Sequence, residues 1–590
     1  MRYRRGFTRH KVAILIGAGV FTLLVLIGVD LYTARSGVTS ARNHVGSAVE
    51  MIHDGRLDRA RMELGAAVED LAAVRNRLRS PWVSIARVVP FAGTEIRAGA
   101  GGVDAVSETA EAALDILDFV LDDRSPLFAE GRISAESVGL LRASLRRAEE
   151  HVTAARKAII RVPRPRLRSI SEALGDIDDA SAALLEVLTG VVPLVDDVYE
   201  AAAGGDPFRL LVFFENEAEL RGTGGIMGFA GVFEIADGNV ALIRAEGMPT
   251  LGRSDTEGGF LAVAAPDDYI RRYGGFQANT ALWSNVNLSP DFPTVADIAG
   301  RLYEKVTGVH AQLIARIDLV GLGYLLDAFT GINVDGEPLM ADTLATDFVI
   351  DSYARSTGQS AYLAAVVVDV FDQVLGGADA ERTVLLRAVD RAFRERRLAL
   401  ASPDDATDEA LRVSGAAGGL LPGDPGDVEV VVQNFAANKI DIYTQATISV
   451  MLQPTGCFMD GELDVELSFD LPTALEGMPQ GYFGNLGRWW TSFYLPRNAE
   501  IVHLAVDGEP AGGTTDVELG RTVASVLMEA ESGGEVSAKV LWREQLYGPN
   551  YTLRMQPQPM VAPAMLSVGA ESSRAFVEMR EIPIPTDCEL

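Results

Sequence analysis

One polar turn in the middle of the chain gathers residue types that can do chemistry. Within residues 208–243, the carboxylate of Glu219, the guanidinium of Arg221 and a Gly-Gly pair follow one another closely. Arginine offers a rigid fork of donors that matches a phosphate or carboxylate, and glycines let backbone N–H groups approach an anion. Glu219 could orient Arg221 or hold a divalent cation. The turn predicts Arg221 and Glu219 as catalytic candidates and Asn216, Thr223, Gly224 and Gly225 as ligand-binding candidates.

A structural interpretation of the same turn is equally compatible with its composition. Glu219 and Arg221 can form an ion pair that pins the chain, and the glycines can be present only because the backbone needs positive φ. The Gly-rich loop of residues 252–259 follows the hairpin and adds Asp255 as a catalytic candidate and Arg253 as a binding candidate, unless the loop is merely solvated.

A second candidate lies in the segment WSNVN. Asn285 can hydrogen-bond sugar hydroxyl groups while the indole of Trp283 offers a stacking face. Residues of these types also commonly order a turn. Both interpretations remain open on the sequence.

The elements that must position the turn are strands and helices in alternation. Residues 208–214 are typical of a buried strand, residues 226–235 and 240–243 of two more, and Asp237-Gly238 of a tight hairpin turn between them. Ser289 or Asp291 is expected to cap a helix over 293–306. These signals predict an α/β layered domain over residues 205–400.

The first residues predict a membrane anchor. Residues 1–11 carry five basic side chains and no acidic one, and the run that follows is apolar. About 20 residues at 1.5 Å rise each can cross a ~30 Å hydrocarbon layer, with the basic flank cytoplasmic. We therefore expect a cytoplasmic tail at 1–11, a single transmembrane helix at 12–32 and an extracytoplasmic bulk of the chain. A cleaved signal peptide is the rival interpretation.

Helical patterning dominates residues 33–204, which predicts a stalk or bundle. The clearest apolar stripe recurs every three or four residues, which places its members on one helix face. The run RVPRPRLR at 161–168 carries four arginines and could meet anionic headgroups or a phosphate, or be a solvated loop. The stripe consists of Leu141, Leu145, Ala148, Val152, Ala155 and Ile159.

The last third of the chain predicts an all-β sandwich. Residues 401–427 are rich in Gly, Pro and Asp, which favours a linker, and short alternating runs separated by turn signals fill residues 428–590. Cys457 and Cys588 could pair in an oxidising compartment, or be two unrelated buried thiols. The complete prediction is a multidomain chain of transmembrane helix, helical bundle, α/β domain and β-sandwich-like domain.

Charge and missing motifs exclude several functions. The net charge is −30, which would repel a nucleic-acid backbone. GTGGIMG lacks the Lys-Ser/Thr ending of a phosphate-binding loop, and no G-x-S-x-G elbow occurs. The histidines show no metal-ligand spacing, so no protein metal site is predicted.

The turn and its surroundings resemble a known family. The run NEAELRGTGG with IMGFAGVFEIADGNV, the segment WSNVNLSPDFPTVADIAGRLYEKVTG and QNFAANKIDIY are similar to the bacterial domain-of-unknown-function 4012 family (DUF4012). That resemblance implies no established activity. The order of strand, arginine turn, hairpin and IDLVGLGYLLDAFTGINV is more faintly similar to the LytR-CpsA-Psr family, which moves glycopolymers from a polyprenyl-pyrophosphate carrier to the cell wall.

Two functions follow from these observations. The first is a membrane-anchored envelope protein of unassigned activity that binds a cell-envelope glycopolymer or another anionic ligand. The alternative, implied by the fainter resemblance, is a phosphotransferase that acts on a polyprenyl-linked glycopolymer. There, Arg221 and Arg253 would clamp the pyrophosphate while Glu219 and Asp255 position a divalent cation, and the resemblance implies Mg2+ as that cation.

Overall fold

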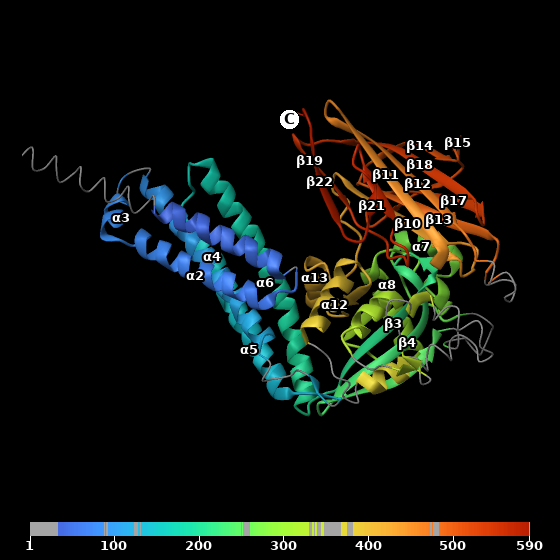
Figure 1. Ribbon diagram of the computed structural model, residues 1–590, viewed down its shortest axis with the longest axis horizontal. Helices are drawn as coiled ribbons and strands as arrows, with labels where there is room; N and C mark the ends of the chain where they lie inside the picture. The colour runs from blue at the N-terminus through green and yellow to red at the C-terminus, as the bar shows by residue number, and fades with distance from the viewer. Residues whose placement is uncertain are drawn as a thin grey trace, which may run out of the picture. The chain divides into compact units, whose positions relative to one another are not determined.

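The computed structural model describes most of the residues that follow the predicted anchor (Figure 1). The predictions for residues 1–11 and 12–32 lie outside the described residues. Among the residues described, no helix has the length and apolarity to cross a membrane. The structure describes residues 33–122 except 53, 88, 90 and 91; 128–329 except 130, 249–250 and 252–259; 333–334, 337–338, 344–346 and 367–374; and 382–588 except 473–474 and 476–482.

The chain forms two compact units. One comprises residues 1–127 and 134–199, and the other comprises residues 128–133 and 200–590. Mixed helical and sheet content in a multidomain chain was predicted and is confirmed. The division at 199/200 lies a few residues before the predicted boundary at 204/205, and the predicted α/β and sandwich segments fall within one unit.

The first unit is a helical bundle in which one long helix is the shared partner of the others. Leu71 and Val74 pack with Val103 of this helix, and farther along it Leu117 packs with Leu64. Its Ala112 lies in a cluster with residues of the following two helices. The elements are a helix at residues 33–52, α2 (Leu57–Leu78), α3 (Pro81–Ala86), the shared helix α4 (Ala92–Val120), α5 (Ala135–Ile160) and α6 (Arg168–Ala202).

The apolar stripe predicted between residues 141 and 159 is the packed face of α5. Leu145, Ala148, Val152 and Ala155 are buried. Ser134 caps the helix by accepting a hydrogen bond from the Ser137 backbone N–H at 3.2 Å. Local periodicity and a local cap were therefore sufficient to specify this helix.

A mixed sheet forms the centre of the second unit. Its strand order is β1-β2-β5-β4-β3-β6-β9, with β6 parallel to β3. Alternate residues of β3 face opposite sides: Leu211 and Phe213 pack with one cluster, Val212 and Phe214 with another. The strands are β1 (Phe128–Ala129), β2 (Arg132–Ile133), β3 (Phe208–Arg221), β4 (Gly224–Ala236), β5 (Asn239–Gly247), β6 (Leu313–Asp318) and β9 (Leu398–Ala401), beside a minor pair β7 (Asn333–Val334) and β8 (Glu337–Pro338).

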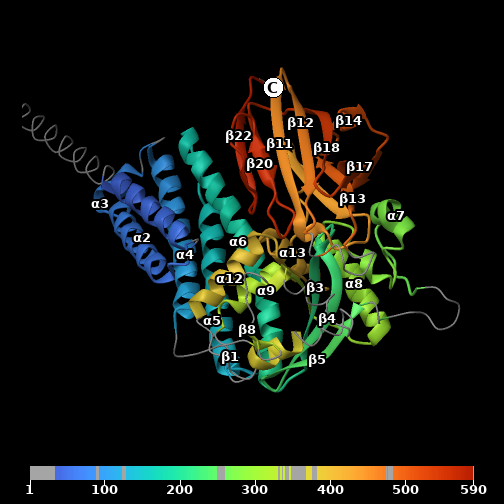
Figure 2. The ribbon, with the colours of Figure 1, turned by 45° about the vertical axis from the view of Figure 1, so that its right-hand side comes forward.

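Helices cover both faces of this sheet, as the prediction of an α/β layered domain requires. Figure 2 shows α8 (Phe292–Thr307) and α9 (Leu319–Leu326) on opposite sides of β3 and β4. Asp291 caps α8 by accepting from the Thr294 N–H at 3.1 Å, and Gly308 ends it at φ 75°. The remaining elements are α7 (Asp267–Tyr273), η2 (Gly274–Phe276), η3 (Trp283–Asn285), α12 (Arg382–Arg394) and α13 (Asp405–Val413).

The polar stretch that was predicted as a turn is the end of a strand. β3 continues past Phe214 as far as Arg221, and its pairing with β4 shifts register after Phe214 and again after Asn216. These bulges let a strand carry a run of charged residues because they re-aim side chains locally. The reversal itself occupies only residues 222–223.

The last third forms the expected β-sandwich. One sheet has the order β16-β17-β13-β10-β19-β22, the other β15-β14-β18-β12-β11-β20-β21. Trp489 and Phe493 from the first sheet share a core with Leu463 and Trp542 from the second. The strands are β10 (Asp427–Asn434), β11 (Thr444–Thr455), β12 (Phe458–Phe469), β13 (Leu486–Leu495), β14 (Glu500–Val506), β15 (Glu509–Pro510), β16 (Thr514–Glu518), β17 (Arg521–Glu531), β18 (Glu535–Gln545), β19 (Asn550–Met555), β20 (Met565–Val568), β21 (Arg574–Ala575) and β22 (Arg580–Pro585), with η4 (Asp441–Tyr443) after β10.

Two features of this region resolve questions left open by the sequence. Within the segment predicted as a linker, residues 401–427, the structure has helix α13, which Asp404 caps by accepting from the Thr407 N–H at 2.9 Å. Cys457 and Cys588 are joined by a disulfide that closes a loop of 131 residues. Cys588 is buried in the sandwich core, so the bond fixes the chain after β22 to that core.

Candidate functional site

The glutamates at the end of β3 are buried in ion pairs. Glu215 lies 3.3 Å from the guanidinium of Arg316, and Glu217 lies 3.7 Å from that of Arg397. Glu219 meets Arg221 at 2.5 Å and also pairs with Lys439. Each carboxylate thus has a cation supplied from its own strand or from a distant part of the chain.

Arg221 is almost fully engaged by the protein itself. Its Nε donates to the Ser284 carbonyl and its Nη1 to the carbonyls of Leu220 and Asn434, each at 3.0 Å. Its Nη2 donates to Glu219. A guanidinium has five N–H donors, and these contacts take four of them while the residue is only 5% exposed. Arg221 cannot offer its fork to an anion, so the structural interpretation of this pair replaces the catalytic one.

The electrostatics of Glu219 agree with this role. Burial alone would raise the pKa of Glu219, but Arg221 and Lys439 outweigh it and hold the pKa below its usual value. Glu219 is therefore a permanently charged partner between two cations. A general acid or base would need a group that changes protonation near the working pH.

Asp441 of η4 completes the joint between the central sheet and the sandwich. Its Oδ2 accepts from the Leu220 N–H and from Asn434 Nδ2, both at 2.8 Å, and its Oδ1 accepts from Trp489 Nε1 at 2.9 Å. Burial raises the pKa of Asp441, and these donors oppose the rise. The hairpin end of the sheet is thus held by the first strands of the sandwich.

The ligand-binding candidates of the turn serve the chain rather than a ligand. Asn216 Oδ1 accepts from the Ala218 N–H at 2.9 Å, and Thr223 Oγ1 donates to Glu215 at 2.5 Å. A Cβ on Gly225 would lie 2.4 Å from the backbone of Asn216, so this glycine permits close backbone packing. Gly224 has φ 142°, which disfavours other residues.

The remaining candidates divide into two groups. Arg253 and Asp255 lie outside the described residues, so their predicted contribution stays a prediction. Trp283 is only 3% exposed, and its Nε1 donates to the Leu251 carbonyl at 3.1 Å. Its indole is core, which corrects the prediction of a stacking face. Asn285 donates to the Phe276 carbonyl at 2.8 Å and also borders a cavity.

That cavity adjoins the outer face of the sandwich beside the joint. Its volume is about 180 Å³. Phe276 of η2 lies edge-on to Phe435, with ring centroids 6.1 Å apart, and tilted against Trp490, at 5.8 Å. The rings form an apolar wall that amide side chains interrupt. Its lining comprises Arg221, Phe276, Asn285, Leu288, Gln433, Asn434, Phe435, Ala437 and Trp490.

Gln433 is the unusual member of this lining. It stands directly opposite Trp490 on the paired strands β10 and β13, so the two side chains share a sheet face. It is 2% exposed, and within the described residues neither its Nε2 nor its Oε1 has a hydrogen-bond partner. Buried amides are nearly always hydrogen-bonded, so this side chain, which borders the cavity, lacks the partner that its burial requires.

Sequence reasoning missed this cavity, although one signal was present. Consecutive residues of a strand face opposite sides, so Trp489 and Trp490 cannot both enter the sandwich core. Trp489 is in the core and fully buried, whereas Trp490 faces the α7–η3 segment, where Tyr273 packs edge-on to it at 6.1 Å. A Trp-Trp pair in a strand therefore indicated an aromatic residue on the outer face.

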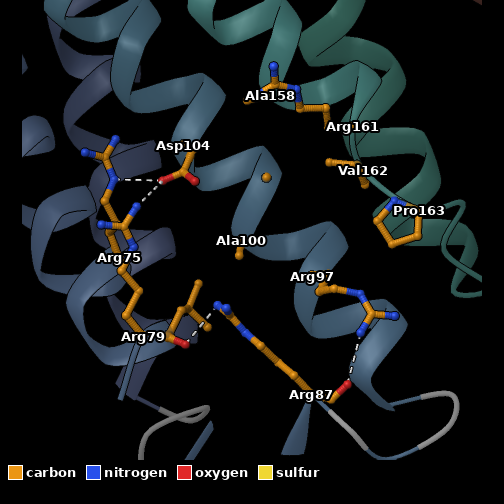
Figure 3. A pocket seen from close by; sticks show the side chains of 12 residues that line it. Arg75, Arg79, Arg87, Arg97, Ala100, Asp104, Ala158, Arg161, Val162 and Pro163 are labelled. Carbon is orange, nitrogen blue, oxygen red and sulfur yellow. Dashed lines mark hydrogen bonds and ion pairs between the residues drawn. The ribbon is translucent and has the colours of Figure 1, made fainter. Parts of the chain in front are cut away.

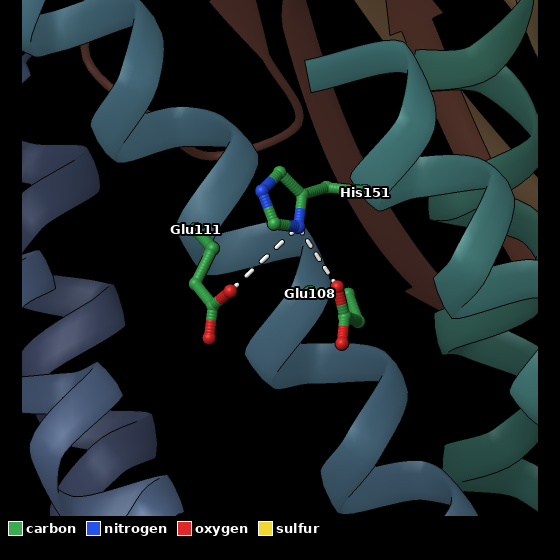
Figure 4. A group of neighbouring side chains, drawn as sticks. All are labelled: Glu108, Glu111 and His151. Carbon is green, nitrogen blue, oxygen red and sulfur yellow. Dashed lines mark hydrogen bonds and ion pairs between the residues drawn. The ribbon is translucent and has the colours of Figure 1, made fainter. Parts of the chain in front are cut away.

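A separate cluster in the helical unit brings a histidine to two carboxylates. His151 Nδ1 of α5 lies 2.8 Å from Glu108 and 3.6 Å from Glu111, both of α4 (Figure 4). Ligand atoms of the three residues lie within 4.8 Å of one another, which would suit a divalent cation. The Nδ1–Glu108 distance is already that of a hydrogen bond, and Nε2 lies 3.9 Å from Asp115. We assign the cluster to polar contact between α4 and α5.

Comparison with known proteins adds a family match for one segment of the chain and no activity. No curated protein matches the chain. Among solved structures, a candidate nutrient binding protein of Legionella pneumophila aligns at 6% identity and a TM-score of 0.15, over 28% of this chain and 65% of its own. An M1 zinc metallopeptidase of Deinococcus radiodurans aligns at 8% identity and a TM-score of 0.14, over 24% of this chain and 39% of its own. Likenesses of this size carry no argument about fold or function.

The match of the sequence to a family is more informative. The LytR-CpsA-Psr resemblance gains no support from these comparisons. Residues 206–353 match the model of a family described as a protein of unknown function (DUF4012), which confirms the resemblance of the NEAELRGTGG region to that family.

Proposed function

We propose that the chain is an extracytoplasmic envelope protein that binds a cell-envelope glycopolymer, with one sugar ring held in the cavity beside Trp490. The observation that carries the proposal is the buried, unpartnered amide of Gln433 facing aromatic walls. Sugar rings combine apolar C–H faces, which suit aromatic side chains, with hydroxyl groups that need both donors and acceptors. One primary amide provides both.

The size of the cavity favours part of a polymer over a free small molecule. Pockets for drug-sized ligands are about 300–1,000 Å³, and this one is about 180 Å³. A single ring fits such a space while the rest of the polymer continues outside. Phe435 is 45% exposed at the rim, so it offers a further contact for an adjoining unit.

The proposed location rests on two independent features. The basic residues 1–11 and the apolar run after them are typical of an anchor whose amino terminus stays in the cytoplasm. The Cys457–Cys588 disulfide suits an oxidising compartment outside that membrane. Both features point to a chain that works on the envelope side.

The alternative, a glycopolymer phosphotransferase, needs an arginine free to clamp a pyrophosphate. The contacts of Arg221 with Ser284, Asn434 and Glu219 weigh against that role. Binding without group transfer is therefore the function that we put forward.

The test is calorimetric titration of the full-length chain, in neutral detergent, with soluble oligosaccharides released from cell-envelope polymers. We expect Trp490→Ala to weaken binding at least tenfold, whereas Tyr547→Ala, which removes a 72% exposed aromatic ring outside the cavity lining, leaves it unchanged. Absence of binding by the unaltered chain, or equal effects of the two variants, would reject the proposal.

A further inference from the structure

A pocket in the helical unit is lined by arginines from several elements. Its volume is about 370 Å³. Figure 3 shows the side chains around the hollow. The pocket lies where α2, α3 and α5 end beside α4. Its charged residues are Arg75 in α2, Arg79 after α2, Arg87 after α3, Arg97 and Asp104 in α4, and Arg161 after α5.

The positive charge of this pocket is poorly compensated. Asp104 is its one carboxylate, and it lies 2.8 Å from Arg75 and 3.9 Å from Arg79. Within the part of the chain that the structure describes, no carboxylate pairs with Arg87, Arg97 or Arg161. This local excess of cations occurs in a chain whose net charge is −30.

The partners of these arginines leave donors unused. Arg87 Nη2 donates to the Leu78 carbonyl and Arg97 Nη1 to the Arg87 carbonyl, each at 3.0 Å. The Nε of Arg87 is buried and, among the described residues, has no hydrogen-bond partner. The macrodipole favours arginine at the C-terminal end of a helix, which accounts separately for the arginines at the ends of α2, α3 and α5 but not for Arg97 near the start of α4. It does not account for five guanidinium groups around one cavity.

We propose that this pocket binds the phosphate group of an anionic ligand. Guanidinium forks match phosphate oxygens two at a time, and several forks around one space suit a phosphodiester or diphosphate better than a single carboxylate. The volume lies within the ~300–1,000 Å³ range of small-molecule sites. The site belongs to the helical unit and does not depend on the glycopolymer cavity.

The surroundings of the pocket favour a lipid as the source of this phosphate. Trp82, Ile85 and Val89 are 42%, 50% and 51% exposed, and they flank Arg87 in sequence. Exposed apolar side chains beside basic ones are typical of a surface that meets anionic headgroups. A soluble phosphate compound shares the same recognition chemistry, so the experiment must separate the two sources.

The experiment titrates the full-length protein, in neutral detergent without divalent metal, with three probes: inorganic pyrophosphate, short-chain phosphatidylglycerol and short-chain phosphatidylcholine. The test variant replaces the exposed Arg97 and Arg161 by glutamine. The matched control replaces Arg59 and Arg168, two exposed arginines of the same unit that do not line the pocket. Both double variants remove the same charge, so nonspecific attraction falls equally in each.

We expect anion binding to weaken about tenfold or more in the test variant, because each charge-assisted hydrogen bond contributes on the order of a factor of ten. Anion binding should persist in the control variant. Binding of phosphatidylglycerol without pyrophosphate identifies a lipid headgroup, and binding of pyrophosphate without the lipid identifies a soluble phosphate. If neither anion binds, if phosphatidylcholine binds equally well, or if both double variants lose the same affinity, the proposal is overturned. Unchanged circular dichroism confirms that the test variant is folded.

Discussion

The Nη1 atom of Arg221 donates a hydrogen bond to the carbonyl of Asn434 at 3.0 Å, and this bond ties the end of the central hairpin to the first strand of the β-sandwich. The same guanidinium reaches Ser284 and Glu219. The most distinctive stretch of the sequence is therefore a joint between two layers of one unit. Its charges hold the fold together, and the open cavity lies beside it.

Replacing Arg221 by alanine is expected to destabilise the protein by about 3–5 kcal/mol, because it leaves the buried Glu219 without one of its cations and removes the donor to three carbonyls. Urea denaturation measures the loss. Arg412→Ala is the control, since Arg412 pairs with Asp408 on an exposed helix face and such pairs contribute roughly 0–1 kcal/mol. Full stability of Arg221→Ala would show that these contacts do not hold the fold together.

Glu217 is expected to make stability fall as the pH rises. Burial raises its pKa from 4.5 to about 8, with Asp318 adding to the rise and Arg397 opposing it. Because the folded state holds this proton more tightly than the unfolded state, its contribution is complete below about pH 4.5 and is lost progressively up to about pH 8. Unfolding free energies measured across this range should decline, and Glu217→Gln should flatten the decline.

The Gln variant also separates two explanations of such a pH profile. The two carboxylate oxygens of Glu217 accept separately from the N–H groups of Leu319 and Val320, each at 3.1 Å. Glutamine keeps one oxygen, so it retains one of these two hydrogen bonds, and it cannot titrate. If the slope persists unchanged in Glu217→Gln, another buried carboxyl controls it. Glu215, Asp441 and Glu518 are among the candidates, because burial raises the pKa of each.

Local signals in the sequence were sufficient for much of the fold. The φ values of 51° and 77° at Asp237 and Gly238 match the tight hairpin expected of that pair. Asp291 and Gly308 bound α8 as capping chemistry requires. The exception is α13. Its capping residue Asp404 was visible in the sequence, but the surrounding Gly and Pro residues led to the prediction of a linker.

The site was less predictable because its partners are distant along the chain. Glu215 and Arg316 are separated by 101 residues, and Glu219 and Lys439 by 220. Composition showed that charged groups cluster near residue 219, but which cations reach them depends on how the sandwich packs on the sheet. For that reason the sequence left an ion pair and an anion site equally open, and only the tertiary contacts decide between them.

The disulfide is expected to contribute about 2–5 kcal/mol to stability, since it closes a long loop of the unfolded chain. Cys588→Ser should lower the denaturation midpoint by the corresponding amount. Dithiothreitol should destabilise the unaltered protein and leave the variant unaffected. An effect of the reductant on the variant would mean that it acts elsewhere.

Gln433→Leu is expected to separate binding from folding. The side chains are similar in size, and leucine removes a buried amide that has no partner among the described residues, so stability should rise by about 1–2 kcal/mol. Oligosaccharide binding should be lost in the same variant, because leucine offers neither donor nor acceptor. Urea denaturation and calorimetry measure the two quantities on one sample. A variant that is less stable yet still binds would mean that Gln433 serves the fold and not a ligand.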